Sequence, residues 1–384
     1  MPRRGFGYLG YDMVRRMEEL GPPQPDPIGI PDAILVRPTV VIVFDAITDA
    51  INVVTPVRPD PAVSAKAAYA RAIERLTEIT TALDRPLAHA EAAPAAEPVE
   101  ATPVSNTTPA EYAEMVRKAK EYIAAGDIFQ VVLAQRFETE FALPPFALYR
   151  ALRRVNPAPF LFFLDYGGFA IAGSSPEILV RVREGTVTIR PIAGTRPRGA
   201  SPHQDQALED ELLDDPKERA EHLMLLDLGR NDVGRVSAIG TVRVTDQFFI
   251  ERYSQVMHIV SNVEGRLDPR FDALEALAAG FPAGTVSGAP KVRAMQIIDE
   301  LEKEKRGLYA GCVGYFSAAG DMDSCIVLRT ALIKDGKMYV QAGAGIVADS
   351  NPTAEQQECV NKAKALFRAA EEARRFASAA KRGQ

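Results

Sequence analysis

Apolar residues recur at helical spacing in several stretches of the chain. In residues 111–125, Tyr112, Met115 and Ala119 fall on one face, and Gly126 follows as expected at a helix C-terminus. The same spacing predicts further helices at residues 61–83, 204–213, 216–228, 271–279, 291–301 and 353–379.

β-Branched and aromatic residues dominate the predicted strands. Residues 39–45 and 51–57 are two such runs, and we expect a hairpin that turns at Thr48 and Asp49. Other strands are predicted at residues 128–137, 160–165, 169–172, 178–182, 186–189, 308–317, 326–334 and 337–342. Because strands are grouped more than they alternate with helices, the pattern favours an α+β fold with mainly antiparallel sheet.

One stretch, residues 86–109, is rich in Ala, Pro, Glu and Thr and has no aromatic residue. Such a composition buries too little apolar surface to order itself, so a flexible linker is predicted there. It separates an N-terminal region, residues 1–85, from a predicted catalytic domain, residues 110–384.

Composition and charge exclude several classes of protein. The chain is 47% hydrophobic and 25% charged with a net charge of −6, which is typical of a globular protein and not of a nucleic-acid-binding one. Its three cysteines have no metal-like spacing, so we expect no disulfide framework and a reducing compartment. No signal peptide or membrane span is predicted. A cytoplasmic location without membrane partners is therefore expected.

Two pairs of glutamates are candidate metal ligands. Glu218 and Glu221 lie three residues apart in a predicted helix, and Glu355 and Glu358 repeat the spacing one turn before Lys362. If the pairs faced each other, their oxygens would suit Mg²⁺. Spacing alone leaves open the more common alternative, a solvated helix face.

Two glycine-containing segments are candidate anion sites. Residues 341–346, QAGAGI, are predicted to form a glycine-rich turn directly after a strand, and residues 282–291 lead into a helix. For residues 341–346, the alternative is a tight turn that binds no ligand. The second segment does not have the glycine and lysine spacing of a phosphate-binding Walker loop, so ATP binding is not expected.

Six longer motifs resemble those of the chorismate-utilising enzymes and, more narrowly, of the large subunit (component I) of anthranilate synthase. They are GDIFQVVLAQRF (126–137), GSSPE (173–177), RPIAGTRPRG (190–199), ERAEHLMLLDLGRNDVGRV (218–236), PAGTVSGAPKVRAM (282–295) and QAGAGIVADS (341–350). The resemblance covers residues 112–370. It implies a large α/β sandwich of two orthogonal, mainly antiparallel sheets with outer helices.

The resemblance implies a role for each candidate residue. Mg²⁺ would be held by Glu218, Glu221, Glu355 and Glu358, with Glu221 and Glu358 as direct ligands. The enolpyruvyl carboxylate of chorismate would be bound by Arg329, Tyr309 and Lys362 and by the backbone of Gly343, Ala344 and Gly345. Glu177 corresponds to the general acid, and His258 and Thr285 correspond to residues of elimination and substrate contact.

Two positions favour one reaction within the family. Water-using relatives have a lysine where this chain has Gln130, and aminodeoxychorismate synthases often have a lysine where it has Ala193. A neutral glutamine cannot act as a base, so the resemblance implies that ammonia attacks chorismate and that the product is anthranilate. A separate glutamine amidotransferase subunit, anthranilate synthase component II, would supply the ammonia in a hetero-oligomer. Aminodeoxychorismate synthase component I remains the alternative.

The opening GFGYLGYD resembles a segment that lies well inside family chains. We therefore expect the N-terminal part to be truncated or its start to be misplaced, which leaves an inactive or merely partner-binding form as a further alternative. Residues 156–161, NPAPFL, resemble half of the family's tryptophan pocket, whose Leu-Leu-Glu-Ser half does not occur in this sequence. Insensitivity to tryptophan is therefore expected.

Overall fold

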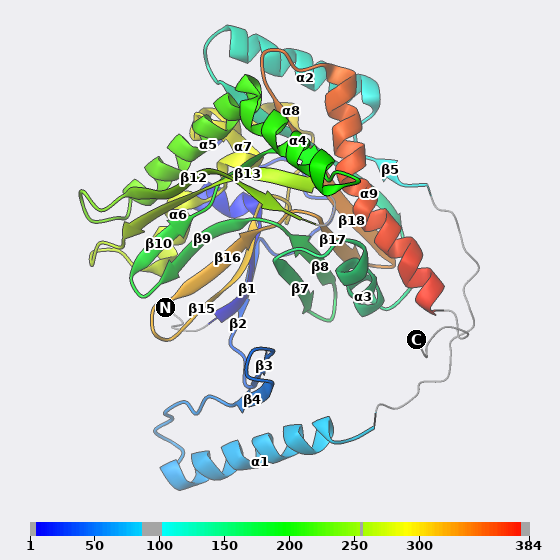
Figure 1. Cartoon of the computed structure of the whole chain (residues 1–384). Helices are drawn as coiled ribbons and strands as arrows, with labels where there is room; N and C mark the ends of the chain where they lie inside the picture. Colours follow the sequence, from blue (N-terminus) through cyan, green and yellow to red (C-terminus); the bar gives the residue numbers. More distant parts are fainter. Residues whose placement is uncertain (1–4, 87–101, 254–255, 378–384) are drawn as a thin grey trace.

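The structure is a computed structural model that describes residues 5–86, 102–253 and 256–377. Two antiparallel β-sheets form the body of the described chain, and helices lie against them (Figure 1). The expected α+β architecture with antiparallel sheets is therefore confirmed. No helix in these residues combines the length and the apolar character needed to cross a bilayer.

The larger sheet has the strand order β11-β13-β10-β9-β16-β15-β1-β2, and β12 pairs with β13. Its strands are β1 (Gly5–Leu9), β2 (Ala33–Val36), β9 (Ile178–Arg183), β10 (Thr186–Ile189), β11 (Ile192–Pro197), β12 (Arg243–Arg252), β13 (Val256–Arg266), β15 (Cys312–Phe316) and β16 (Met322–Ile326). The opening GFGYL thus forms an interior strand, since β1 lies between β15 and β2. It was not predicted, because Gly5 and Gly7 interrupt its apolar pattern.

The smaller sheet has the order β14-β6-β18-β17-β8-β7, and β5 pairs with β6. Its strands are β5 (Val104–Ser105), β6 (Gln130–Glu140), β7 (Phe160–Asp165), β8 (Ala170–Ser175), β14 (Gly288–Ala289), β17 (Thr330–Lys334) and β18 (Lys337–Ile346). Strand β5 falls inside the predicted linker, so residues 104–105 correct that prediction. Residues 87–101 of the linker lie outside the described part of the chain.

Helices pack on both sheets. They are η1 (Tyr11–Arg16), α2 (Pro109–Ala124), α3 (Pro145–Val155), α4 (Pro202–Asp214), α5 (Pro216–Gly234), α6 (Ala273–Gly280), α7 (Gly284–Ser287), α8 (Lys291–Leu301) and α9 (Pro352–Ala377). Helices α2, α3 and α9 contact the smaller sheet, and α4, α5 and α6 contact the larger one. Capping fixes their starts: Thr108 and Glu111 form a capping box on α2, and Asp215 accepts two backbone N–H groups of α5.

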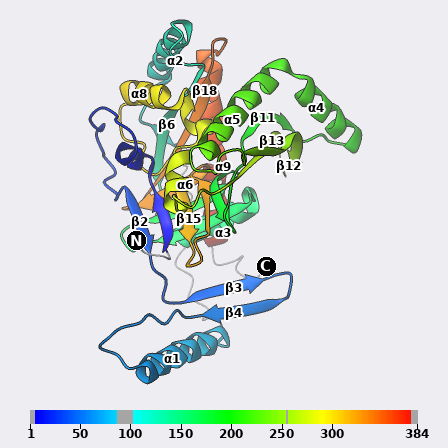
Figure 2. The ribbon, with the colours of Figure 1, turned by 90° about the vertical axis from the view of Figure 1, so that its left-hand side faces the viewer.

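The predicted hairpin is confirmed as β3 (Val41–Asp45) and β4 (Ala50–Val54), followed by helix α1 (Ala65–Leu83). This unit extends from the two-sheet body (Figures 1 and 2). Several of its apolar side chains are exposed, among them Phe44 and Ile47.

Two predictions about single elements are wrong. Residues 326–334 do not form one strand: β16 ends at Ile326 and β17 begins at Thr330 in the other sheet. Arg329 between them has a φ of +48°, which turns the chain. The glycine-rich turn at residues 341–346 is instead a continuation of β18, paired with β6 as far as Ile346 and Val131.

The glycines of β18 provide space instead of a turn. A Cβ on Gly343 would lie 2.9 Å from both the Leu133 carbonyl oxygen and the Tyr309 hydroxyl, and one on Gly345 would collide with the Gln130 amide. Glycine thus allows two neighbouring side chains to approach the strand closely.

Candidate active site

Glu177 occupies the short link between β8 and β9, and its side chain is only 6% exposed. The Thr285 hydroxyl of α7 donates to its carboxyl oxygens at 3.1 and 3.2 Å. Burial raises the pKa of Glu177 to about 8, although the Thr285 hydrogen bond and the positive charge of Arg329 act in the opposite direction. Glu177 therefore carries a proton at neutral pH and is able to donate it.

His258 lies on β13 and is also buried. Its Nδ1 is 2.9 Å from the Gly194 carbonyl oxygen, which can only accept, so Nδ1 carries the proton. The Thr195 hydroxyl is 3.1 Å from the same nitrogen. Burial lowers the pKa of His258, and the charge of Arg329 lowers it further. The ring is consequently neutral at pH 7, with Nε2 as its basic nitrogen.

Arg329 links these two groups electrostatically. Burial lowers the pKa of its guanidinium, while Tyr253 and Glu177 raise it. The left-handed backbone conformation of Arg329 directs the chain from one sheet to the other, and its carbonyl accepts from the Ser174 N–H at 3.2 Å. A cation is thus held beside the buried acid.

Tyr309, Gly343 and Lys362 form a second group. A backbone hydrogen bond joins Gly343 to the Tyr309 hydroxyl. The Lys362 ammonium of α9 donates to the Gly343 carbonyl oxygen at 2.9 Å and pairs with Glu358 at 2.7 Å. The neighbouring Ala344 is fully buried in the main hydrophobic cluster, so its side chain is part of the core.

The two predicted glutamate pairs lie on α5 and α9, and their charges interact. Burial raises the pKa of Glu221, and repulsion by Glu218 and Glu358 raises it further, whereas a hydrogen bond from Gln130 at 3.0 Å lowers it. Burial and the nearby Glu358 also raise the pKa of Glu355. The fold therefore brings four carboxylates from two separate helices to one region.

These carboxylates do not converge on one point. Within the described residues, no group of three or more His, Cys, Asp or Glu side chains is arranged to hold a metal ion. Two of the four pair with cations instead: Lys362 pairs with Glu358, and Arg196 pairs with Glu218 at 3.2 Å. The donor set nevertheless fits Mg²⁺, because it is all oxygen and mutually repulsive, and the buried Gln130 carbonyl oxygen beside it has no hydrogen-bond partner.

Two residues of this region were not predicted. Tyr253 lies 5.6 Å from the His258 ring, centroid to centroid, and its hydroxyl donates to Glu251 at 2.8 Å. Burial and that carboxylate raise the pKa of Tyr253, so its hydroxyl stays protonated at neutral pH. No spacing signal marks either residue, because they reach the region only through the pairing of β12 and β13.

Comparison with known proteins assigns this fold and site to a class. The family model described as "chorismate binding enzyme" matches residues 2–368, and the chain belongs to this family. It is 60% identical over 379 residues to anthranilate synthase component 1 of Cereibacter sphaeroides, covering 98% of this chain and 75% of the relative. Identity to the protein of the same name from Pseudomonas putida is 52% over 367 residues, covering 94% and 74%.

Solved structures of similar proteins have the same fold as this chain. Anthranilate synthase component I from Streptococcus pneumoniae TIGR4 superposes with a TM-score of 0.85 at 43% identity, covering 94% of this chain and 80% of that one. The menaquinone-specific isochorismate synthase MenF from Escherichia coli shares the fold, with a TM-score of 0.73 at 24% identity, covering 96% and 79%. The expected membership of the chorismate-utilising enzymes is confirmed.

Proposed function

We propose that the chain is the large subunit of an anthranilate synthase, which converts chorismate and ammonia to anthranilate, pyruvate and water. The observation that carries the proposal is the buried carboxyl of Glu177, which accepts a hydrogen bond from Thr285 and whose pKa is raised by burial to about 8. The similarity to anthranilate synthase components supports the choice of reaction.

Glu177 would supply the proton with which the ring hydroxyl of chorismate leaves as water while ammonia adds to the ring. A ring proton is then lost, the ether C–O bond breaks, and the enolpyruvyl group takes up a proton and leaves as pyruvate. The neutral Nε2 of His258 is suited to accept the ring proton. The hydroxyl of Thr285 would orient the carboxyl of Glu177.

The remaining residues would bind and orient chorismate. We assign the enolpyruvyl carboxylate to Arg329, Tyr309 and Lys362 together with the backbone of Gly343–Gly345, since a guanidinium fork matches a carboxylate. The ring carboxylate would lie at the glutamates of α5 and α9 (Glu218, Glu221, Glu355 and Glu358), which would hold Mg²⁺. When bound, this ion would neutralise the substrate's charge and fix its orientation.

Gln130 supports ammonia over water as the nucleophile. Its amide donates to Glu221, and a neutral amide cannot deprotonate water. Ammonia would come from a separate glutamine amidotransferase subunit in a cytoplasmic hetero-oligomer. Aminodeoxychorismate synthase component I is the second candidate, and the buried methyl group of Ala193 disfavours it because it provides no amine.

Purified protein incubated with chorismate, Mg²⁺ and ammonium tests the proposal. We expect fluorescent anthranilate and an equal amount of pyruvate, with little isochorismate when ammonium is left out. Accumulation of 4-amino-4-deoxychorismate would favour the second candidate, and the absence of any aminated product would contradict both.

A further inference from the structure

Arg306 follows helix α8 and has a completely buried guanidinium. Its side chain is 1% exposed, and its partner Glu302 is 6% exposed. Nε and Nη2 donate to the two carboxylate oxygens at 2.9 and 2.5 Å, and one of these oxygens also accepts from the Ala134 N–H at 2.9 Å. This two-point pairing offsets the cost of removing both charges from water.

The other donors of Arg306 hold two backbone segments that carry site residues. Nη1 donates to the Val286 carbonyl oxygen at 2.7 Å, and Nη2 donates to the Val132 carbonyl oxygen at 2.6 Å. Val286 follows Thr285 in the one-turn helix α7, and Val132 lies two residues after Gln130 on β6. A single guanidinium thus joins α7 to the smaller sheet.

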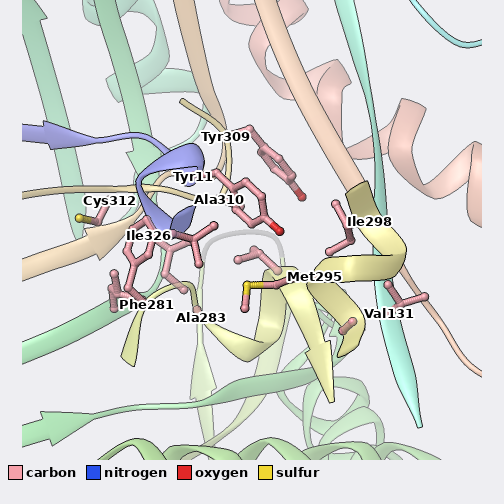
Figure 3. Close-up of a cluster of buried hydrophobic side chains, with 14 of the residues drawn as sticks. Tyr11, Val131, Phe281, Ala283, Met295, Ile298, Tyr309, Ala310, Cys312 and Ile326 are labelled. Atoms are coloured by element: carbon pink, nitrogen blue, oxygen red, sulfur yellow. The ribbon is translucent and has the colours of Figure 1, made fainter. Parts of the chain in front are cut away.

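The guanidinium of Arg306 also lies over two aromatic rings. Its Cζ lies 5.5 Å from the centroid of Tyr309 and 4.8 Å from that of Tyr11. Figure 3 shows both tyrosines among the buried side chains of the main cluster. The Tyr309 hydroxyl meets the backbone of Gly343, so stacking on Arg306 fixes the direction in which this hydroxyl points.

We infer that Arg306, neutralised by Glu302, is a positioning residue that holds Tyr309 in the geometry that binds the enolpyruvyl carboxylate, while its bond to Val286 anchors helix α7, which carries Thr285. The inference rests on the proposed function, which places Tyr309 and Gly343 at that carboxylate. Arginine suits the role because a lysine ammonium lacks the planar fork that reaches four acceptor oxygens on three residues and lies over two rings at once.

The test compares Arg306→Lys with Arg15→Met. Arg15, on η1, pairs with Asp299 of α8 at 2.7 Å and donates to no residue assigned to the site, so its variant is the control. Chorismate affinity is measured by calorimetry with Mg²⁺ and without ammonium, and KM and kcat are measured with ammonium. In Arg306→Lys, we expect Kd and KM to rise about tenfold and kcat to fall less than about threefold, because ground-state binding is lost. Arg15→Met should leave all three unchanged.

If Arg306→Lys folds and has the same Kd and KM as the wild type, the inference is overturned. If that variant does not fold, Glu302→Gln replaces it with the same expected rise in KM, and an unchanged KM would again overturn the inference. Calorimetry separates this outcome from failure of the proposed function. A wild type that binds chorismate but forms no anthranilate contradicts the function, while the affinity of the variant still tests Arg306. A wild type that does not bind chorismate contradicts both.

Discussion

Glu177 and the glutamates of α5 and α9 are acidic groups in two different environments. Glu177 is a lone carboxyl in a buried link, where desolvation is the main reason for its raised pKa. Glu221 and Glu355 belong to a cluster in which neighbouring carboxylates add repulsion to burial. The first environment retains a proton, whereas the second concentrates negative charge that a divalent cation would neutralise. Residue type alone therefore does not decide whether a glutamate acts as a general acid or as a metal ligand; the surroundings of its carboxyl decide it.

The sharpest test of this difference is Glu177→Gln, which keeps the shape of the side chain but removes the transferable proton. We expect kcat for anthranilate formation to fall by about 10³-fold, within the range of general acid catalysis, while chorismate affinity is retained. Initial rates and calorimetry measure the two quantities. A loss below tenfold would show that another group protonates the leaving hydroxyl.

Removing a carboxylate from the cluster should act through the metal instead. Glu221→Ala or Glu358→Ala is expected to lower the rate at limiting Mg²⁺ by about 10²-fold and to leave the fold intact, because loss of a ligand weakens metal binding. Titration of Mg²⁺ against activity measures the effect. Asp227→Ala is the matched control, since Asp227 lies on α5 with an exposed carboxylate. If Glu221→Ala retains wild-type activity at limiting Mg²⁺, the metal site is assigned wrongly.

A smaller effect should come from Thr285→Val, which removes the hydroxyl that donates to Glu177. That hydrogen bond stabilises the charged carboxylate, so its loss raises the pKa of Glu177 further. In the wild type, kcat should fall as the pH rises through about 8, where Glu177 loses its proton. In Thr285→Val, this alkaline limb should shift upward by about one pH unit. An alkaline limb that stays at the wild-type pH would show that Thr285 does not influence the pKa of Glu177.

The same proton links Glu177 to stability. Its folded pKa of about 8 lies above the ordinary glutamate value of 4.5, so the folded protein binds this proton more tightly than the unfolded chain does. The stabilising contribution is present below pH 4.5 and is lost as the pH rises to about 8. Chemical unfolding at several pH values should therefore show less decline over this interval in Glu177→Gln than in the wild type.

The sequence predicted local elements better than the connections between them. Helix α8 and strand β7 occur where their periodicity predicts. Residues 341–346 were interpreted as a turn because glycine favours turns, but here glycine makes room for Tyr309 and Gln130. The break at Arg329 was missed because a left-handed arginine has no sequence signal.

How the candidate site is assembled likewise could not be predicted from local spacing, and the roles of its residues came from the family resemblance. Spacing within one helix indicated each glutamate pair, but packing of distant segments decides that the two pairs lie close enough for their charges to interact. The contact between Tyr253 and His258 depends on the pairing of β12 with β13, and the sequence pattern predicts no strand over β12. The contacts of Arg306 likewise could not be predicted from the sequence, because its partners come from separate parts of the chain.

The central claim is that burial keeps Glu177 protonated at neutral pH. Protein labelled with ¹³C at the glutamate side-chain carboxyl, compared with Glu177→Gln to identify the missing signal, gives the pKa of this group by NMR titration. We predict a midpoint near 8. A midpoint near the ordinary glutamate value of 4.5 would contradict the claim and leave the site without its general acid.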